Sequence, residues 1–173
     1  MKTTPLPFKK KLALKLFNRY RANEKSTHIL NYLFWECTLR CNLSCLHCGS
    51  DCKKEAVVPD MPKEDFFRAL DDITPIITPN KTMIVLTGGE ALLRKDIFEI
   101  GQELYRRGFP WGVVSNGMTL KPKIIDLLID AGLRSITISL DGLESSHQWL
   151  RGNKLSFKNA IEAITYLRKF DDV

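Results

Sequence analysis

The chain has 173 residues, of which 44% are hydrophobic and 27% are charged, and its formal net charge is +6. This length allows one domain with a substantial core and argues against two. No apolar run approaches the roughly 20 residues that a membrane span needs. The basic start of the chain lacks the apolar region of a signal peptide, because Lys15 follows directly on Leu12-Ala13-Leu14. We therefore expect a cytoplasmic, globular protein.

The positive charge is concentrated at the N-terminus. Residues 1–30 contain eight Lys or Arg and one acid, Glu24, so they carry +7 and the other 143 residues sum to −1. A nearly neutral body has no electrostatic footprint for nucleic acid, and we expect no nucleic-acid partner.

Residues 1–25 are expected to form a basic helix, since Phe8, Leu12, Leu16 and Tyr20 recur every four residues. The favoured interpretation is a helix packed on the body with its lysines in solvent. The alternative is weak contact with an anionic membrane surface or an acidic partner. We assign residues 1–28 to this N-terminal extension.

The rest of the chain alternates short apolar strands with helices. The pattern predicts strands at 29–36, 83–86, 111–114 and 135–140, and helices at 62–73, 96–107, 121–131 and from 156 onwards. Gly108 and Gly132 stand where helices end, and Ser156 is a candidate N-cap. The distance from Gly88 to Gly117 is 29 residues and from Gly117 to Gly142 is 25 residues, which matches a βα unit.

Short apolar strands of this kind are buried on both faces, which predicts a parallel sheet with helices outside. Right-handed crossovers place the strands in sequence order. The expected fold class is therefore α/β: a partial (βα) TIM-type barrel with four parallel strands and outer helices, preceded by the basic N-terminal helix. Because about eight strands close such a barrel, we interpret residues 29–173 as a core domain that is incomplete at its C-terminus.

Function in parallel α/β barrels lies at the carboxyl ends of the strands. Four turns are expected to meet there: Cys37–Cys52, Thr87–Glu90, Ser115–Gly117 and Ser139–Gly142. This convergence makes that end of the sheet the candidate site.

All five cysteines lie in the first of these turns, and Cys41, Cys45 and Cys48 have the spacing C-x3-C-x2-C. In a reducing compartment, clustered cysteines indicate a metal more than disulfides. Three thiolates can hold one side of a [4Fe–4S] cluster and leave one iron open. The rival interpretation is structural zinc, with a fourth ligand from Cys37, Cys52 or His47. The spacing alone leaves both open.

Three motifs resemble those of radical S-adenosylmethionine enzymes. The cysteine segment, with His47 before its last ligand, resembles the cluster-binding signature of that superfamily. Thr87-Gly-Gly-Glu-Ala-Leu-Leu-Arg94 resembles its GGE motif. Ser139-Leu-Asp-Gly142, followed by His147 and Arg151-Gly152, resembles the segment after the fourth strand in the peptide-modifying branch, which includes SPASM-type maturases. The resemblance runs from about residue 30 to residue 170.

The resemblance implies two cofactors, a [4Fe–4S] cluster and S-adenosylmethionine. Their expected contacts are Cys41, Cys45 and Cys48 as cluster ligands; Gly88, Gly89 and Glu90 at the methionine ammonium; Ser139 and Arg151 at its carboxylate; the backbone near His47 at adenine; and Asn116 at the ribose. Cys37 and Cys52 are expected to be bystanders, and no catalytic side chain is indicated.

Each of these assignments has a simpler alternative. Gly88-Gly89 and Asn116-Gly117 also suit tight turns, Arg151 suits a solvated surface, and His47 suits a surface position or a zinc ligand. Asp141 is either a substrate contact or part of an Asp-Gly turn.

The implied reaction is reductive cleavage of S-adenosylmethionine to a 5′-deoxyadenosyl radical that abstracts hydrogen from a substrate, with a peptide or protein as the leading expectation. It needs an external one-electron reductant, flavodoxin- or ferredoxin-like. The alternatives are a small-molecule substrate, a non-catalytic iron–sulfur or zinc-binding domain, and an inactive fragment of a longer enzyme.

Overall fold

The computed structural model describes residues 6–50, 52–56 and 58–170, and the chain divides into two units, residues 1–30 and 31–173. The first unit contains α1 (Phe8–Thr27), a helix without buried residues that ends at His28 in the left-handed conformation. The helix expected over residues 1–25 is thus confirmed from Phe8, and residues 1–5 lie outside the described residues. Within the described part of the chain, no helix is long and apolar enough to cross a membrane.

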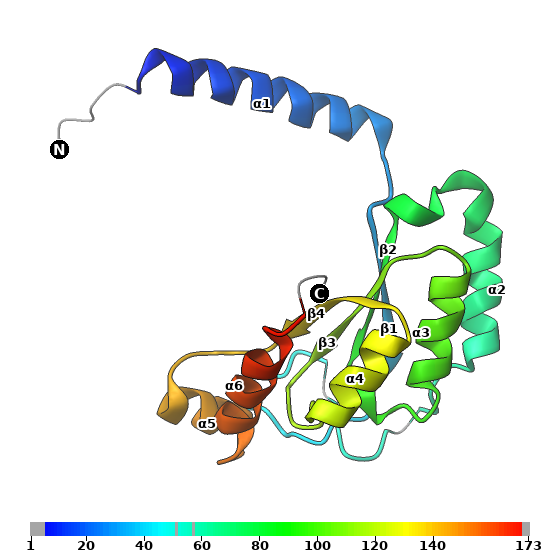
Figure 1. The fold of residues 1–173 in the computed structure, drawn as a ribbon, viewed down its shortest axis with the longest axis vertical. Coiled ribbons are helices and arrows are strands. Elements are labelled where there is room, and N and C mark those ends of the chain that lie inside the picture. The colour runs from blue at the N-terminus through cyan, green and yellow to red at the C-terminus, as the bar shows by residue number, and fades with distance from the viewer. Residues whose placement is uncertain (1–5, 51, 57, 171–173) are drawn as a thin grey trace. The chain divides into compact units, whose positions relative to one another are not determined.

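The second unit is built on a sheet of four parallel strands, paired in the order β1-β2-β3-β4 (Figure 1). Their bounds are β1 (Tyr32–Thr38), β2 (Met83–Gly88), β3 (Trp111–Ser115) and β4 (Leu133–Ile138). Sequence order within the sheet confirms the expected α/β, partial-barrel architecture.

Helices follow the strands. Their bounds are α2 (Lys63–Ile73), α3 (Ile97–Arg106), α4 (Pro122–Asp130), α5 (Glu144–Arg151) and α6 (Ser156–Leu167), with short 3₁₀ turns at Thr74–Ile76, Pro79–Lys81 and Ala91–Leu93. The sequence did not predict α5. It also gave Ser156 the wrong role: its hydroxyl donates to the carbonyl of Asn153 at 2.7 Å instead of capping α6.

The core lies between the sheet and its helices. Along β1, Trp35 and Cys37 are buried, whereas Tyr32 and Phe34 are 59% and 65% exposed. The side chains alternate between two faces, so β1 is not buried on both faces as its apolar sequence predicted. Trp35 stacks on Phe66 of α2, with ring centroids 3.9 Å apart and planes at 4°. The strand face that carries Trp35 therefore faces the helical layer.

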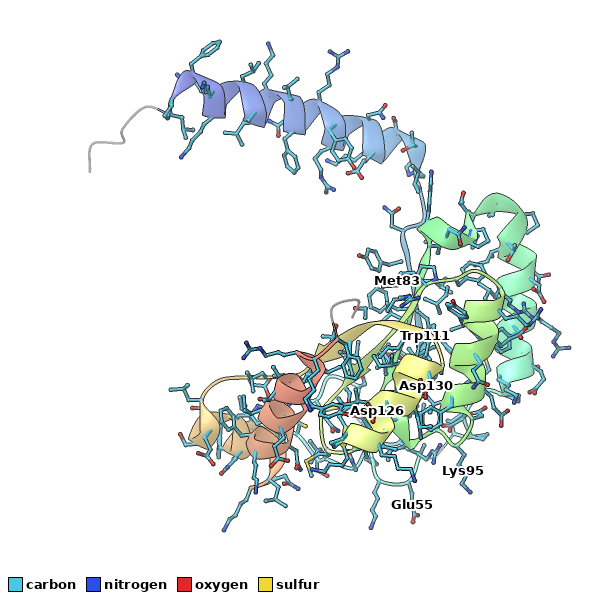
Figure 2. All side chains as sticks on the ribbon, viewed as in Figure 1. Glu55, Met83, Lys95, Trp111, Asp126 and Asp130 are labelled. Atoms are coloured by element: carbon cyan, nitrogen blue, oxygen red, sulfur yellow. The ribbon has the colours of Figure 1, made fainter. Side chains whose placement is uncertain are left out.

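Trp111 of β3 fills the centre of this layer (Figure 2). Its indole N–H donates to the carbonyl of Ala131 at 3.2 Å. A Cβ at Gly101 of α3 would lie 2.2 Å from the indole ring, so this glycine is required for α3 to approach the sheet.

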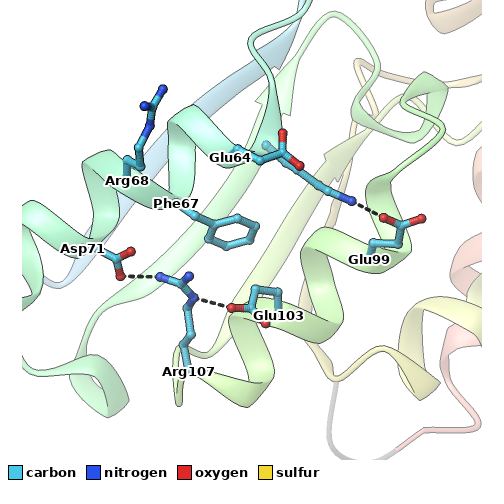
Figure 3. A pocket seen from close by; sticks show the side chains of 8 residues that line it. Glu64, Phe67, Arg68, Asp71, Glu99, Glu103 and Arg107 are labelled. Carbon is cyan, nitrogen blue, oxygen red and sulfur yellow. Dashed lines mark hydrogen bonds and ion pairs between the residues drawn. The ribbon is translucent and has the colours of Figure 1, made fainter.

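A charged hollow lies on the outer side, between α2 and α3 (Figure 3). Arg107 bridges Asp71 and Glu103 there, and its guanidinium lies 4.6 Å from the ring centroid of Phe67. Hydrogen bonds from Arg106 and Arg107 lower the pKa of Glu103 to about 2. The Arg107–Asp71 pair connects the end of α3 to α2, and Arg107 lies shortly before the amino end of β3 and not at the carboxyl ends of the strands.

Candidate functional site

The cysteine loop is closed at its base by backbone hydrogen bonds. The N–H of Cys41 donates to the carbonyl of Lys53 at 2.8 Å, and the N–H of Lys53 donates to the carbonyl of Leu39 at 3.3 Å. Cys41, Leu43 and Cys52 form a small buried cluster, on which Cys45 packs. The loop is therefore a folded extension of β1.

The cysteines differ in accessibility. Cys41 is buried, Cys45 is half-buried and Cys48 is exposed. Cys37 belongs to the main core instead, where its thiol donates to the carbonyl of Thr87 at 3.2 Å and burial raises its pKa to about 12. Burial also raises the pKa of Cys52 to about 11, and the neighbouring Cys48 and Cys41 act in the same direction.

The Gly-Gly-Glu turn after β2 is bonded to the start of the cysteine loop. The N–H of Gly89 donates to the carbonyl of Thr38, and that of Glu90 donates to the carbonyl of Arg40, both at 2.8 Å. A Cβ at Gly88 would lie 2.1 Å from the Thr38 carbonyl oxygen, and one at Gly89 would lie 2.2 Å from that of Arg40. Both glycines are thus needed for this approach.

The side chain of Glu90 is fully buried and joins two strand ends. Its carboxylate accepts hydrogen bonds from the Ser115 hydroxyl and from the Asn116 N–H, both at 2.8 Å. Burial raises the pKa of Glu90, and these hydrogen bonds offset that effect in part. The expected contact of this carboxylate with a methionine ammonium stays a prediction.

Asn116 is held in a turn. Its Oδ1 accepts from the N–H of Met118 at 2.9 Å, and its Nδ2 donates to Oδ1 of Asn42 at 2.8 Å and lies 3.7 Å from Sγ of Cys41. This geometry favours the turn alternative for Asn116, and a ribose contact stays untested.

Arg151 ends α5 beside the cysteine loop. Its Nε and Nη2 donate to the two carboxylate oxygens of Asp141 at 2.6 and 3.1 Å, and its Nη1 lies 3.7 Å from Sγ of Cys45. The backbone fixes the same approach, since the N–H of Leu46 donates to the carbonyl of Leu150 at 2.8 Å. Arg151 is therefore a half-buried, oriented side chain and not a freely solvated one.

Two histidines flank Asp141. Nε2 of His47 lies 3.7 Å from its carboxylate, and Nδ1 of His147 accepts from the Asp141 N–H at 3.2 Å. Burial lowers the pKa of His147; the Asp141 carboxylate opposes this effect, and Arg151 and His47 add to it. Burial alone would raise the pKa of Asp141, but Arg151 and both histidines hold it below its ordinary value.

The predicted residues thus gather at the strand ends. Cys41 meets Asn116, Cys45 meets Arg151, and the Gly-Gly-Glu turn meets the base of the cysteine loop. Ser139 extends the pairing of β4, with its N–H donating to the carbonyl of Ser115 at 3.0 Å.

Two supporting residues were not predicted. Arg94 is buried, with Nη1 donating to the carbonyls of Cys37 at 2.7 Å and Met61 at 3.0 Å. Asp60 accepts from the hydroxyl of Thr38 at 2.6 Å and pairs with Arg40. Arg94 could have been singled out from the sequence, because it is the last residue of the segment that resembles the GGE motif. The sequence offers no comparable signal for Asp60.

These residues fit an iron–sulfur cluster by the chemistry of the donor set. The loop supplies three thiols, and side-chain N–H groups of Asn116 and Arg151 face two of the sulfur atoms. Such donors suit thiolates bound to a cluster. Among the residues that the structure describes, no group of three His, Cys, Asp or Glu side chains is arranged to hold a single metal ion.

Comparison with known proteins defines the class. Residues 35–171 match the family model of the radical SAM superfamily. The chain therefore belongs to that superfamily, and membership implies a [4Fe–4S] cluster and S-adenosylmethionine as cofactors.

Two relatives with similar sequence identity carry names that describe different activities. The chain is 30% identical over 146 residues to the AdoMet-dependent heme synthase of Methanosarcina barkeri (strain Fusaro / DSM 804), covering 84% of this chain and 41% of that protein. It is 31% identical over 141 residues to the sporulation killing factor maturation protein SkfB of Bacillus subtilis (strain 168), covering 79% of this chain and 33% of that protein. The chain thus spans about two fifths or less of the length of these relatives.

Solved structures share the fold. Native anSMEcpe with bound AdoMet has a TM-score of 0.64 at 19% identity, over 81% of this chain and 41% of that one. Streptococcus suis SuiB bound to the precursor peptide SuiA has a TM-score of 0.64 at 17% identity, over 99% of this chain and 38% of that one.

Proposed function

We propose that this chain carries the cluster-binding and S-adenosylmethionine-binding part of a radical SAM enzyme. The observation that carries the proposal is the joining of three strand ends around the cysteine loop. The Gly-Gly-Glu turn bonds to the loop through Thr38 and Arg40, and Arg151 reaches Cys45 from α5.

In this proposal Cys41, Cys45 and Cys48 hold the cluster. When bound, the reduced cluster and S-adenosylmethionine supply a 5′-deoxyadenosyl radical that abstracts hydrogen from the substrate. Cys37 and Cys52 remain protonated bystanders, in keeping with their raised pKa values.

The other residues of the site orient the cofactor. The Gly88–Glu90 turn offers backbone oxygens and a carboxylate to the methionine ammonium. Arg151, with Ser139 near it in the motif, offers a planar cation to the carboxylate. The backbone near His47 contacts adenine, and Asn116 lies on the ribose side.

A peptide or protein is our leading substrate class, because the segment from Ser139 to Gly152 resembles that of peptide-modifying relatives. SkfB, named for maturation of a killing factor, supports this choice. A tetrapyrrole is the second candidate, supported by the similarity to heme synthases.

Two partners follow from the proposal. The reaction needs a one-electron donor of the flavodoxin or ferredoxin kind, which we place in the cytoplasm. The N-terminal unit, rich in Lys and Arg, supports contact with an acidic partner or an anionic surface. Binding to anionic vesicles that does not weaken with added salt would contradict the electrostatic part of this proposal.

The decisive experiment is anaerobic reconstitution with iron and sulfide, followed by dithionite and S-adenosylmethionine. We expect about four irons and four sulfides per chain, and formation of 5′-deoxyadenosine. Stoichiometric zinc without sulfide would instead support the structural-zinc alternative. A fully loaded cluster without 5′-deoxyadenosine would support a non-catalytic domain or an inactive part of a longer enzyme.

Matched cysteine variants test the ligand assignment. Cys45→Ala should lose most of its iron and sulfide, whereas Cys52→Ala should retain them. The opposite result would overturn the choice of ligands.

A further inference from the structure

Two of the three candidate cluster ligands face a side-chain N–H donor from a distant part of the chain. Nδ2 of Asn116 lies 3.7 Å from Sγ of Cys41, and Nη1 of Arg151 lies 3.7 Å from Sγ of Cys45. The donors are 75 and 106 positions away from their sulfur atoms. These N–H···S contacts therefore arise from tertiary structure and not from the loop itself.

The amide of Asn116 is fixed in the orientation that presents its N–H groups to the loop. Its Oδ1 accepts from the N–H of Met118, so an exchange of oxygen and nitrogen would place two donors against each other. Its Nδ2 carries two hydrogens; one is used by Asn42, at 2.8 Å, and the other is left for Cys41. Asn116 as a whole is only 6% exposed, which excludes most competing water.

Arg151 is fixed by its other nitrogens. Asp141 accepts from Nε and Nη2, so the planar guanidinium directs Nη1 toward Cys45. The end of α5 cannot withdraw easily, because Leu150 is hydrogen-bonded to Leu46 and a Cβ at Gly152 would lie 3.3 Å from the Ser44 carbonyl oxygen.

We propose that Asn116 and Arg151 donate hydrogen bonds to the Cys41 and Cys45 thiolates and thereby raise the reduction potential of the cluster. The inference rests on the proposed function, since it requires that these thiolates hold the cluster. Reduction adds negative charge that spreads over the sulfur atoms. Donors aimed at those atoms stabilise the reduced state more than the oxidised state.

This role differs from the ribose and carboxylate contacts expected for the same residues, because it needs no S-adenosylmethionine. The test is therefore an EPR-monitored redox titration of the reconstituted protein without S-adenosylmethionine. Asn116→Ala, which leaves the net charge unchanged, should shift the potential to more negative values. Arg151→Lys keeps the charge but loses the planar fork, and it should shift the potential in the same direction.

Asn159→Ala is the matched control. The amide of Asn159 also faces a sulfur atom, Sδ of Met118 at 3.4 Å, which is not a candidate ligand. The reduction potential of the cluster in Asn159→Ala should equal that in the unaltered protein. If Asn116→Ala and Arg151→Lys also match the control, the inference is wrong while the proposed function stands. If the unaltered protein takes up no iron and sulfide, the proposed function itself fails.

A measurement on the unaltered protein covers the case in which a variant does not accept a cluster. Pulsed EPR of the reduced cluster, with ¹⁵N placed selectively in the side chains of asparagine or arginine, should show magnetic coupling to each labelled nitrogen. Absence of coupling in both samples would overturn the inference.

Discussion

The carboxylate of Glu90 accepts a hydrogen bond of 2.8 Å from the hydroxyl of Ser115, which is 25 positions further along the chain. This buried contact joins the turn after β2 to the end of β3. In Glu90→Gln, an NH₂ group replaces one of the two acceptor oxygens of the carboxylate. This NH₂ group would then face the Ser115 hydroxyl or the Asn116 N–H, which are themselves donors. We expect a loss of about 1–3 kcal/mol in the free energy of unfolding, measured by urea denaturation. Glu64→Gln, at an exposed position of α2, should change it little; equal effects would contradict the role of Glu90.

Gly89→Ala should damage the site through crowding. The added Cβ would lie 2.2 Å from the Arg40 carbonyl oxygen and 3.2 Å from Cβ of Cys41, so the base of the cysteine loop must move. We expect a loss of about 1–3 kcal/mol in stability, together with reduced iron uptake. At Gly49 no atom lies within 4 Å of an added Cβ, so Gly49→Ala should leave both quantities unchanged. Normal iron uptake by Gly89→Ala would show that the loop tolerates displacement.

Arg94→Ala should be the most destabilising single change in the supporting shell of the site. It leaves the Asp96 carboxylate and the carbonyls of Cys37 and Met61 without their donor. We expect a loss of roughly 3 kcal/mol in the free energy of unfolding, measured by urea denaturation. Arg106→Ala removes an exposed partner of Glu103 and should cost less than about 1 kcal/mol. A cost for Arg94→Ala no larger than this would refute the proposed anchoring.

Cys37 predicts a pH dependence of stability at high pH. Its folded pKa is raised to about 12 by burial, whereas an unfolded thiol ionises near pH 8.5. The unfolded chain thus loses a proton that the folded chain retains, and stability should fall as pH rises from about 8.5 to about 12. The free energy of unfolding of the apoprotein, measured across this pH range, should decline less steeply for Cys37→Ala than for the unaltered protein. This comparison of slopes does not depend on the absolute stability of the variant. Identical slopes for the two proteins would contradict the raised pKa.

The same burial predicts selective alkylation. Iodoacetamide at neutral pH should modify the exposed Cys48 of the native apoprotein at least tenfold faster than Cys37, because only a thiolate reacts readily. Peptide mass mapping measures both rates. Comparable labelling would mean that Cys37 is accessible.

Asp141→Asn tests how Arg151 is oriented. Asparagine can accept one hydrogen bond from the guanidinium where aspartate accepts two, so the arginine loses its fixed direction. We expect weaker binding of S-adenosylmethionine to the reconstituted protein by roughly tenfold, equivalent to about 1.4 kcal/mol, measured by anaerobic calorimetry. Asp126→Asn, whose carboxylate accepts from Tyr166 between α4 and α6, serves as the control. Tighter binding would instead mean that Asp141 competes with the cofactor for Arg151.

Much of the fold could be predicted because periodicity and helix ends are local signals. The end of α3 follows from Gly108, which adopts a φ of +79°, and the parallel strands follow from short apolar runs. Helix α5 was missed because its eight residues, Glu144–Arg151, contain one buried side chain, that of His147. Such a helix leaves little apolar periodicity to detect.

The site could be predicted in outline for a different reason. Parallel strands bring their carboxyl ends together, so motifs at those ends were expected to meet. Individual contacts were not accessible, because they depend on side-chain direction. Nothing in the sequence indicates that Glu90 faces Ser115, or that one edge of Arg151 is occupied by Asp141.

The hydrogen bond between Leu46 and Leu150 has a consequence for biosynthesis. The cysteine loop leaves the ribosome about a hundred residues before the helix that supports it, so at a typical elongation rate the thiols wait roughly 5–20 seconds for their partner. Throughout that interval Arg151 cannot reach Cys45, whereas Asn116, only 75 positions after Cys41, is synthesised before Arg151. A cluster that enters the arrangement described here, with Arg151 at Cys45, must therefore arrive after α5 has been synthesised.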